Sequence, residues 1–287
     1  MVSTIALIAP GAMGSAIGRC LTEHGARVLT LIEGRSERTI MRSREAGMIA
    51  VAASDLATAD LILSITPPAV ALGLAESLAP ILRQSRSKPA FIDFNAINPD
   101  TMRKVSAALA ETGCEVLDGA IIGSPPVPGR KGPTLYVSGD PHHRADMLSG
   151  LGLRVRHIDG PLGAASALKM VYAGISKGSI AIGTAMLLAS VRAGCAQGLR
   201  EELGESRPEI LARFTWAIPD MYEKAYRWVA EMQEIAAFLG PDDPAAGLFE
   251  AAAGIFARMA EDRNANGALA ESLNHVLAIE NGEAKKP

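Results

Sequence analysis

The 287-residue chain has few cysteines, few aromatic side chains and little net charge. Its three cysteines, Cys20, Cys114 and Cys195, are far apart and odd in number. Their spacing fits neither a metal motif nor a disulfide framework, which indicates a reducing, cytoplasmic compartment. A net charge of −3 is too near neutral for a surface that binds nucleic acid. With only 4% aromatic residues, we expect a core built mainly of Ala, Leu, Ile and Val.

Signals for membrane insertion and secretion are also missing. The uncharged stretch 178–191, between Lys177 and Arg192, is shorter than the about 18–20 apolar residues that cross a bilayer. The apolar N-terminus has no basic segment before it and is too short for a signal peptide. We therefore expect no membrane association.

A glycine-rich turn near the N-terminus is the first positive signal. A strand predicted at 4–9 runs into the turn, and a helix predicted at 13–23 follows it. The turn matches the dinucleotide pattern G-x-G-x-x-G, with Ala9 in place of the first glycine. In such a turn the backbone and the helix N-terminus face the pyrophosphate of a bound dinucleotide. The expected contacts are Gly11, Ala12, Met13 and Gly14.

Short apolar segments alternate with helical patterns as far as Asp159. The other strands are predicted at 27–33, 61–66, 90–94, 115–122, 134–138 and 155–157, and the other helices at 36–46, 69–82 and 101–111. Strands separated by helices pair in parallel through right-handed crossovers. This predicts an α/β fold whose first domain, residues 1–160, is a Rossmann-type doubly wound parallel sheet.

The pattern changes at Gly160-Pro161. Beyond this point Ala-rich helical periodicity replaces the strand signals, beginning with one long helix at about 162–193. Residues 161–287 are therefore predicted to form a smaller all-α domain for substrate binding and dimerisation, and the polar tail 281–287 is expected to fray.

The end of the second predicted strand carries two conflicting signals for the cofactor. Glu33 stands where an acidic residue would bind the ribose diol of NAD. Arg35, Ser36 and Arg38 would instead hold the 2′-phosphate of NADP, because guanidinium and hydroxyl groups donate well to phosphate oxygens. Three donors in one short loop favour NADP over NAD, although both arginines could be solvated residues at a helix start.

Thr66 and Pro67 follow the strand predicted at 61–66. A loop at the carboxyl end of a parallel strand borders the cofactor crevice of this fold class. An ordinary proline turn explains the same residues equally well.

Three further motifs resemble one enzyme family. The segment Asp93–Pro99 resembles the D-x-S-T-x-S-P motif of the β-hydroxyacid dehydrogenases, and 132–135 resembles G-P-S-L of the 6-phosphogluconate dehydrogenases. Lys169–Ile175 is similar to their K-M-V-H-N-G-I. The segment 226–236 looks like the short helical C-terminal domain of bacterial and archaeal relatives.

The resemblance implies NAD(P)-dependent oxidation of a small anionic hydroxy acid, or reduction of its oxo form. It places Asn95 beside the nicotinamide, where we expect it to contact both cofactor and substrate, and Lys169 at the reacting hydroxyl as general acid/base. A hydride leaves a carbinol carbon only as the O–H proton is removed, so a base must lie within hydrogen-bond reach. A lysine on an apolar helix beside a positive ring would have a lowered pKa. A surface lysine with a buried stem is the alternative.

The chain departs from the family at the substrate positions. Ala173 stands where relatives carry Asn, and Tyr172 replaces His or Asn. The Ser-Gly-Gly loop of the family corresponds to residues 123–126, with Ser124 displaced by one position and two prolines that remove backbone donors. We predict that Ser124 and Tyr172 orient a substrate other than 6-phosphogluconate.

Two other functions stay open. A sensor or scaffold that binds NADP without turnover would account for Ala173 and the altered 123–126 loop, but not for the retained Lys169. An imine reductase would use a related fold, but it would usually carry another residue at position 169.

The long helix predicts a homodimer, because its apolar residues surround it too fully for one small domain to cover. The apolar residues are Ile180, Ile182, Met186, Leu187, Leu188 and Val191, and Gly174, Gly178 and Gly183 would permit close helix approach.

No metal site is expected. His142 and His143 are adjacent and point apart on a helix, and no carboxylate is suitably spaced.

Overall fold

The computed structural model describes residues 2–8, 10–127, 129–130 and 132–278. The predictions for Ala9 and for the tail 281–287 therefore lie outside the described residues. The chain divides into two compact units, Met1–Met170 (unit 1) and Val171–Pro287 (unit 2). The division falls inside a helix, ten residues after the boundary predicted at Gly160-Pro161.

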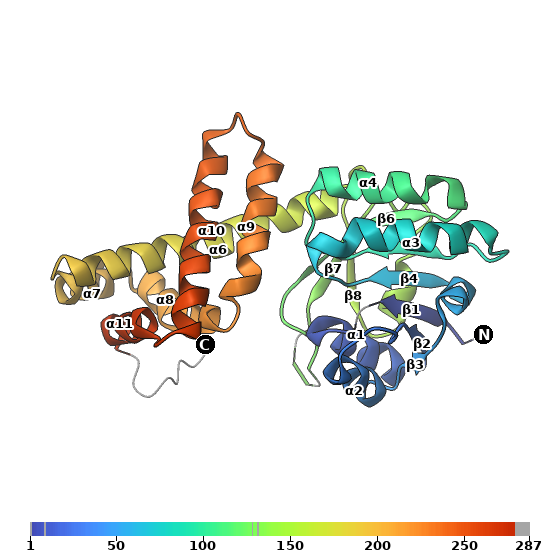
Figure 1. The fold of residues 1–287 in the computed structure, drawn as a ribbon, viewed down its shortest axis with the longest axis horizontal. Helices are drawn as coiled ribbons and strands as arrows, with labels where there is room; N and C mark the ends of the chain where they lie inside the picture. Colours follow the sequence, from blue (N-terminus) through green and yellow to red (C-terminus); the bar gives the residue numbers. More distant parts are fainter. Residues whose placement is uncertain (1, 9, 128, 131, 279–287) are drawn as a thin grey trace. The chain divides into compact units, whose positions relative to one another are not determined.

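Unit 1 is built around one eight-stranded sheet with the order β3-β2-β1-β4-β5-β6-β7-β8 (Figure 1). The strands are β1 (Thr4–Ile8), β2 (Arg27–Thr30), β3 (Ile49–Ala50), β4 (Leu61–Ser64), β5 (Ala90–Asp93), β6 (Val116–Ile122), β7 (Thr134–Ser138) and β8 (Arg154–His157). The pairs from β3 through to β6 are parallel, which confirms the Rossmann-type α/β fold.

The strand pairing of the sheet differs from the sequence prediction in two places. β7 pairs antiparallel with β6, because the chain between these strands contains no helix, within its described residues, that could return it for parallel pairing. The two-residue strand β3 was not predicted, and both of its residues are exposed. β8 then pairs parallel with β7.

Helices cover both faces of the sheet because alternate strand residues point to opposite sides. Ile5 and Leu7 of β1 belong to one apolar cluster, with Ile17 and Leu21 of α1. Ala6 and Ile8 belong to the other cluster, with residues of α3 and α4. Figure 1 shows α1 and α2 on one face and α3 and α4 on the other.

The helices of unit 1 are α1 (Ala12–Glu23), α2 (Glu37–Glu45), α3 (Ala71–Gln84), α4 (Pro99–Leu109) and α5 (Asp146–Gly150), with short 3-10 helices at Ala53–Thr58, Pro68–Val70 and Ala110–Thr112. Helix α6 (Ala164–Arg192) begins in unit 1 and continues into unit 2.

Unit 2 is helical throughout its described residues, as predicted. After α6 it contains α7 (Ala196–Ser206), α8 (Pro208–Tyr222), α9 (Ala225–Leu239), α10 (Pro244–Asn264) and α11 (Ala268–Leu277). The helices α9 and α10 form a hairpin (Figure 1). Lys177 of α6 pairs with Glu231 of α9 and lies 4.9 Å from the centre of the Trp228 ring.

The glycines of α6 pack against helices of the same chain. A Cβ atom on Gly174 would lie 3.1 Å from the Phe249 ring, and one on Gly183 would lie 2.5 Å from the Phe214 ring. Helices α10 and α8 of the same chain therefore occupy the space beside these glycines.

An apolar stripe remains exposed on α6. It consists of Val171, Ile175, Ile182 and Met186, whose helical spacing places them on one face. By length and composition alone, α6 could cross a membrane, and half of its most apolar 18-residue window is buried in the protein; one such helix is weak evidence for a membrane span.

Candidate functional site

The carboxyl ends of β1 and β4 form the point at which the order of the sheet reverses. These strands are neighbours, yet the helix after β1 packs on one face of the sheet and the helix after β4 packs on the other. Ligands of open α/β sheets bind in the crevice that this arrangement leaves. The predicted cofactor residues of both loops therefore adjoin it.

The N-terminus of α1 offers free backbone donors at this crevice. Gly11 is the N-cap residue, and no described side chain caps the helix. Gly11 and Ala12 are exposed, and an added Cβ on Gly11 would meet nothing within 4 Å. Gly14 is buried on the face of α1 that packs on the sheet. The open space and the uncapped N–H groups fit a pyrophosphate.

The turn between β2 and α2 carries the other predicted cofactor residues. Gly34 adopts φ +68°, and Glu33, Arg35 and Arg38 are exposed on either side of it. Ser36 is the N-cap of α2, and its hydroxyl oxygen accepts a hydrogen bond from the Thr39 N–H at 3.4 Å. Two guanidinium groups therefore stand beside a helix N-terminus, an arrangement that favours a phosphate.

Asn95 is almost fully buried and joins the ends of β4 and β5. Its side-chain oxygen accepts from the Thr66 backbone N–H and from the Thr66 hydroxyl, the latter at 3.2 Å. Its amide nitrogen donates to Ser64 Oγ and to Asp93 Oδ2, each at 2.8 Å. Asn95 thus holds the Thr66-Pro67 loop in place at the crevice.

A buried row of polar side chains crosses the sheet beside this loop. Ser64, Asp93, Asp118 and Ser138 are partners of one another on the adjacent strands β4 to β7, and each is at most 1% exposed. We call these four residues the polar row. Burial raises the pKa of the Asp93 carboxyl to about 7, against hydrogen bonds from Asn95 that lower it, and the charge of Asp118 adds to the rise.

Asp118 of the polar row fixes the beginning of α6. Its carboxylate accepts hydrogen bonds from the Ser166 N–H at 2.9 Å, the Ser166 hydroxyl at 2.5 Å and the Ser138 hydroxyl at 2.9 Å. Ser138 Oγ in turn accepts from the Ala165 N–H. Burial raises the pKa of the Asp118 carboxyl despite these donors. A negative charge at a helix N-terminus is favourable, so the row orients α6.

Sequence reasoning did not assign a role to the polar row. The position of these residues in the chain could have indicated a role, since Ser64 and Asp93 are the last residues of β4 and β5. The carboxyl ends of parallel strands are where sites form in this fold class.

Lys169 lies one turn after Ser166, within unit 1. Its ammonium nitrogen donates to the backbone oxygen of Ile121 at 2.8 Å, and the side chain is half-buried. Ile121 is near the carboxyl end of β6, three residues before the exposed Ser124. Tyr172 belongs to unit 2 and is 53% exposed. The structure thus places Lys169 at the strand end that leads into the Ser124 loop.

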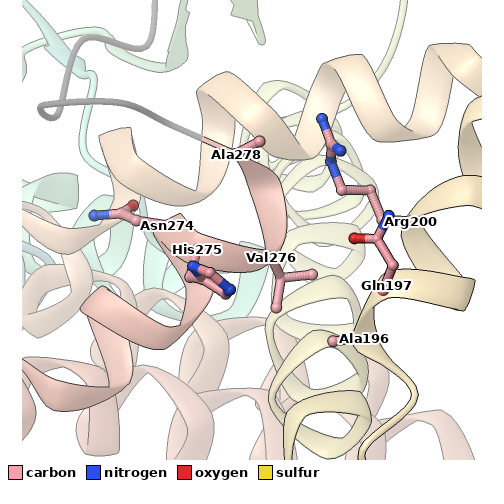
Figure 2. Close-up of a pocket in the computed structure, with 7 residues that line it drawn as sticks. All are labelled: Ala196, Gln197, Arg200, Asn274, His275, Val276 and Ala278. Atoms are coloured by element: carbon pink, nitrogen blue, oxygen red, sulfur yellow. The ribbon is translucent and has the colours of Figure 1, made fainter.

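A separate hollow of about 390 Å³ lies in unit 2 between α7 and α11 (Figure 2). Its polar lining residues are Gln197, Arg200, Asn274 and His275. It shares no residue with the predicted cofactor site.

Comparison with known families assigns the first part of the chain. Residues 4–152 match the NAD binding domain of 6-phosphogluconate dehydrogenase. The chain belongs to this family. Residues 191–259 match a domain of unknown function, DUF1932. No curated protein matches the chain.

Solved structures show the same fold over nearly the whole chain. A conserved protein of unknown function, MTH1747, described as similar in structure to 3-hydroxyacid dehydrogenases, is 26% identical, with a TM-score of 0.68 over 91% of this chain and 98% of that one. A conserved hypothetical protein from Sinorhizobium meliloti is 24% identical, with a TM-score of 0.71 over 96% and 97%. The 3-hydroxyisobutyrate dehydrogenase of Mycobacterium tuberculosis, solved with L-serine, is 20% identical, with a TM-score of 0.69 over 92% and 95%. These structures show the shared fold, and the family match over residues 4–152 supports the binding of a nicotinamide dinucleotide.

Proposed function

We propose that the protein is an NADP-dependent oxidoreductase that acts on a small anionic hydroxy acid or its oxo form, with Lys169 as general acid/base. The observation that carries the proposal is the position of Lys169. Its ammonium group lies at the carboxyl end of β6, in the same unit as the glycine turn. An ionisable side chain that is not fully buried, at the sheet edge where this fold binds ligands, is a candidate for proton transfer.

The cofactor would be held by residues from three loops. The backbone of Gly11, Ala12, Met13 and Gly14 would face the pyrophosphate. Arg35 and Ser36 would contact a 2′-phosphate, whereas Glu33 would favour the ribose of NAD, and Thr66, Pro67 and Asn95 would border the nicotinamide. When bound, the nicotinamide accepts or supplies the hydride.

Lys169 would move the proton at the substrate oxygen. In the oxidative direction the neutral amine takes the hydroxyl proton, and in the reductive direction the ammonium returns it. The Ile121 carbonyl accepts a hydrogen bond from the ammonium form, and Asp118 fixes the first turn of the helix that carries Lys169. The side chain is therefore held in a defined place before substrate arrives.

Ser124 and Tyr172 are proposed to orient the substrate. Both are exposed and carry hydroxyl groups that donate to a carboxylate or accept from a hydroxyl. We also propose that the protein is a homodimer, because four large apolar side chains on one face of α6 are at least half exposed.

The proposal is tested with Lys169→Met, which keeps the apolar stem and removes the proton carrier. A screen of 2- and 3-hydroxy acids, their phosphates and their oxo forms first identifies the best substrate. Turnover by Lys169→Met should then fall by about 10²–10⁴-fold, the usual contribution of a positioned acid/base. Binding of NADPH, followed by nicotinamide fluorescence, should persist, because none of the proposed cofactor contacts is changed.

Lys88→Met is the matched control. Lys88 also lies in unit 1, and its ammonium group also donates to backbone carbonyls, those of Leu82 and Arg83. It lies before the amino end of β5, however, and not at the carboxyl end of a strand. It should retain full turnover. A near-normal rate for Lys169→Met would refute the mechanism, and a wild type that binds NADPH tightly but turns over no candidate would favour the sensor.

A further inference from the structure

Two histidines and two aspartates gather in unit 1 around the loop between β7 and α5. Nε2 of His157 lies 2.7 Å from Asp146 Oδ1, and Nδ1 of His143 lies 3.7 Å from Asp146 Oδ2. One nitrogen of each histidine and one oxygen of Asp146 all lie within 4.8 Å of one another. We call His143, Asp146 and His157 the histidine cluster.

Asp140 stands behind the cluster and is itself held rigidly. Its side chain is 1% exposed, and its two oxygens accept hydrogen bonds from the N–H groups of Arg144 at 2.8 Å and Ala145 at 2.9 Å. Its Oδ2 lies 3.9 Å from Nδ1 of His157, while Nε2 of the same ring faces Asp146. A carboxylate on the far side of a histidine is the usual support of a metal-binding imidazole, because it orients the ring and fixes its tautomer.

We propose that the histidine cluster binds one divalent transition-metal ion, with zinc as the type ion. Two imidazoles and one carboxylate are a typical ligand set for zinc, and bonds of about 2.0 Å at tetrahedral angles separate the ligand atoms by about 3.3 Å. The two nitrogen–oxygen separations, 2.7 Å from His157 and 3.7 Å from His143, lie on either side of this value, and each involves a different oxygen of Asp146. Imidazole ligands select zinc, nickel or copper over magnesium and calcium.

Two of the three proposed ligands, His143 and His157, line an open hollow. A space of about 410 Å³ is lined by Asp140, His143, His157 and Asp159. It leaves room for a water molecule or for an anionic ligand on the metal. A site with three protein ligands and one exchangeable position binds zinc more weakly than a closed four-ligand site, and it remains accessible.

The histidine cluster is separate from the proposed cofactor site. The neighbouring Arg144 donates to the backbone oxygen of Asp60, which precedes β4, and His142 contacts Glu115, which precedes β6. These contacts place the loop at the amino ends of the parallel strands, whereas the cofactor residues follow their carboxyl ends. A bound metal would therefore join the start of α5 to the end of β8 and stabilise the edge of the sheet.

From the sequence we predicted no metal site. His142 and His143 do point apart, since His142 Nδ1 lies 3.0 Å from Glu115 Oε1, but they lie in the turn before α5 and not on a helix as predicted. The carboxylate is supplied by Asp146 three residues on, and the second imidazole comes from β8, which the pairing with β7 brings alongside. His157 is far enough along the chain that spacing alone does not connect it with His143.

The test is direct zinc binding by the full chain. Protein freed of metal by a chelator is titrated with ZnCl₂ in competition with a chromophoric zinc indicator, in wild type, His143→Asn and His157→Ala. Asparagine suits position 143 because that residue has φ 52°, a conformation that asparagine tolerates. We expect one zinc per wild-type chain at micromolar concentration and at least a tenfold loss of affinity in each variant, on the order of the effect of a lost metal contact.

Two controls make the result specific. His142→Ala removes the adjacent imidazole and should bind zinc as the wild type does. Cys20→Ser tests a competing pair, because Cys20 Sγ lies 3.9 Å from His24 Nδ1, and it should also leave binding unchanged. Zinc should raise the melting temperature of the wild type but not of His157→Ala, since a ligand of the folded state stabilises it.

The proposal is overturned if the wild type binds no zinc at micromolar concentration. It is equally overturned if folded His143→Asn and His157→Ala, checked by circular dichroism, bind as tightly as the wild type, or if Cys20→Ser alone abolishes binding. The d–d spectrum of the Co²⁺-loaded protein gives an independent readout. It should lack the sulfur charge-transfer band that a cysteine ligand would add.

Discussion

Replacing Asp93 with asparagine should change how the stability of the protein depends on pH. Burial raises the pKa of Asp93 from its ordinary value of 3.8 to about 7. Between these two values the folded chain keeps a proton on Asp93 that the unfolded chain has released. The free energy of unfolding therefore falls as the pH rises through this window, because the folded state binds more protons.

The size of the effect follows from the shift. A difference of about three pKa units corresponds to about 4 kcal/mol, at about 1.4 kcal/mol per unit. At the acidic end of the window the Asp93 carboxyl is neutral and does not lower the free energy of unfolding. At the neutral end the carboxyl is charged, and the free energy of unfolding is lower by this amount. In Asp93→Asn the side chain is neutral at every pH and nearly isosteric, so this part of the dependence should disappear.

The measurement is urea unfolding of wild type and Asp93→Asn across the window. We expect the variant to gain up to about 4 kcal/mol relative to the wild type on going from the acidic to the neutral end. Asp118 also has a raised pKa and is unchanged in the variant, so some decline with pH should remain in both proteins. Asp242→Asn, a change at an exposed aspartate, is the control and should follow the wild type. Identical pH profiles for wild type and Asp93→Asn would refute the reasoning.

Two further predictions concern the cofactor and the assembly. Arg35→Ala should weaken NADPH binding by about 10–150-fold, the loss of one charge-assisted contact of about 1.5–3 kcal/mol, and leave NADH binding unchanged. Fluorescence titration measures both, and equal affinity of the wild type for NADH and NADPH would contradict the assignment. Ile182→Asp puts a charge on the α6 stripe and should convert the proposed dimer to a monomer in sedimentation, whereas Leu248→Asp, at a similarly exposed apolar residue on α10, should not. A wild type that sediments as a monomer at micromolar concentration would remove the dimer proposal.

The α/β fold could be predicted because its signals are local. Strand β1 is a run of apolar residues that ends at a glycine turn, and α1 follows with apolar residues at helical spacing. Strand ends were less certain. The second strand was predicted to reach Glu33 but ends at Thr30, because the chain leaves the sheet there and enters the turn that contains Gly34. Strand β3 has only two residues, too few for any period to be visible.

Contacts between segments that lie far apart in the chain could not be predicted from the sequence. The glycines of α6 were interpreted as room for a partner helix, and the structure shows Phe249 and Phe214 of the same chain against them. Glycine spacing reports that something approaches closely, but not which helix does so. The exposed stripe on α6 is a separate observation, because its members, Ile182 and Met186 among them, remain at least half exposed in the folded chain.

The polar row links the two halves of the candidate site through the register of the sheet. Asn95 ties Asp93 and Ser64 to the Thr66 loop on one side, and Asp118 ties the same row to Ser166 in the first turn of α6 on the other. Lys169 follows one turn later and returns to β6 at Ile121, three residues along the strand from Asp118. A slip of one residue between β5 and β6 would turn Asp118 to the opposite face of the sheet and release α6. The position of the proposed proton carrier relative to the cofactor loop thus depends on the register between β5 and β6, in which Asp93 is paired with Asp118.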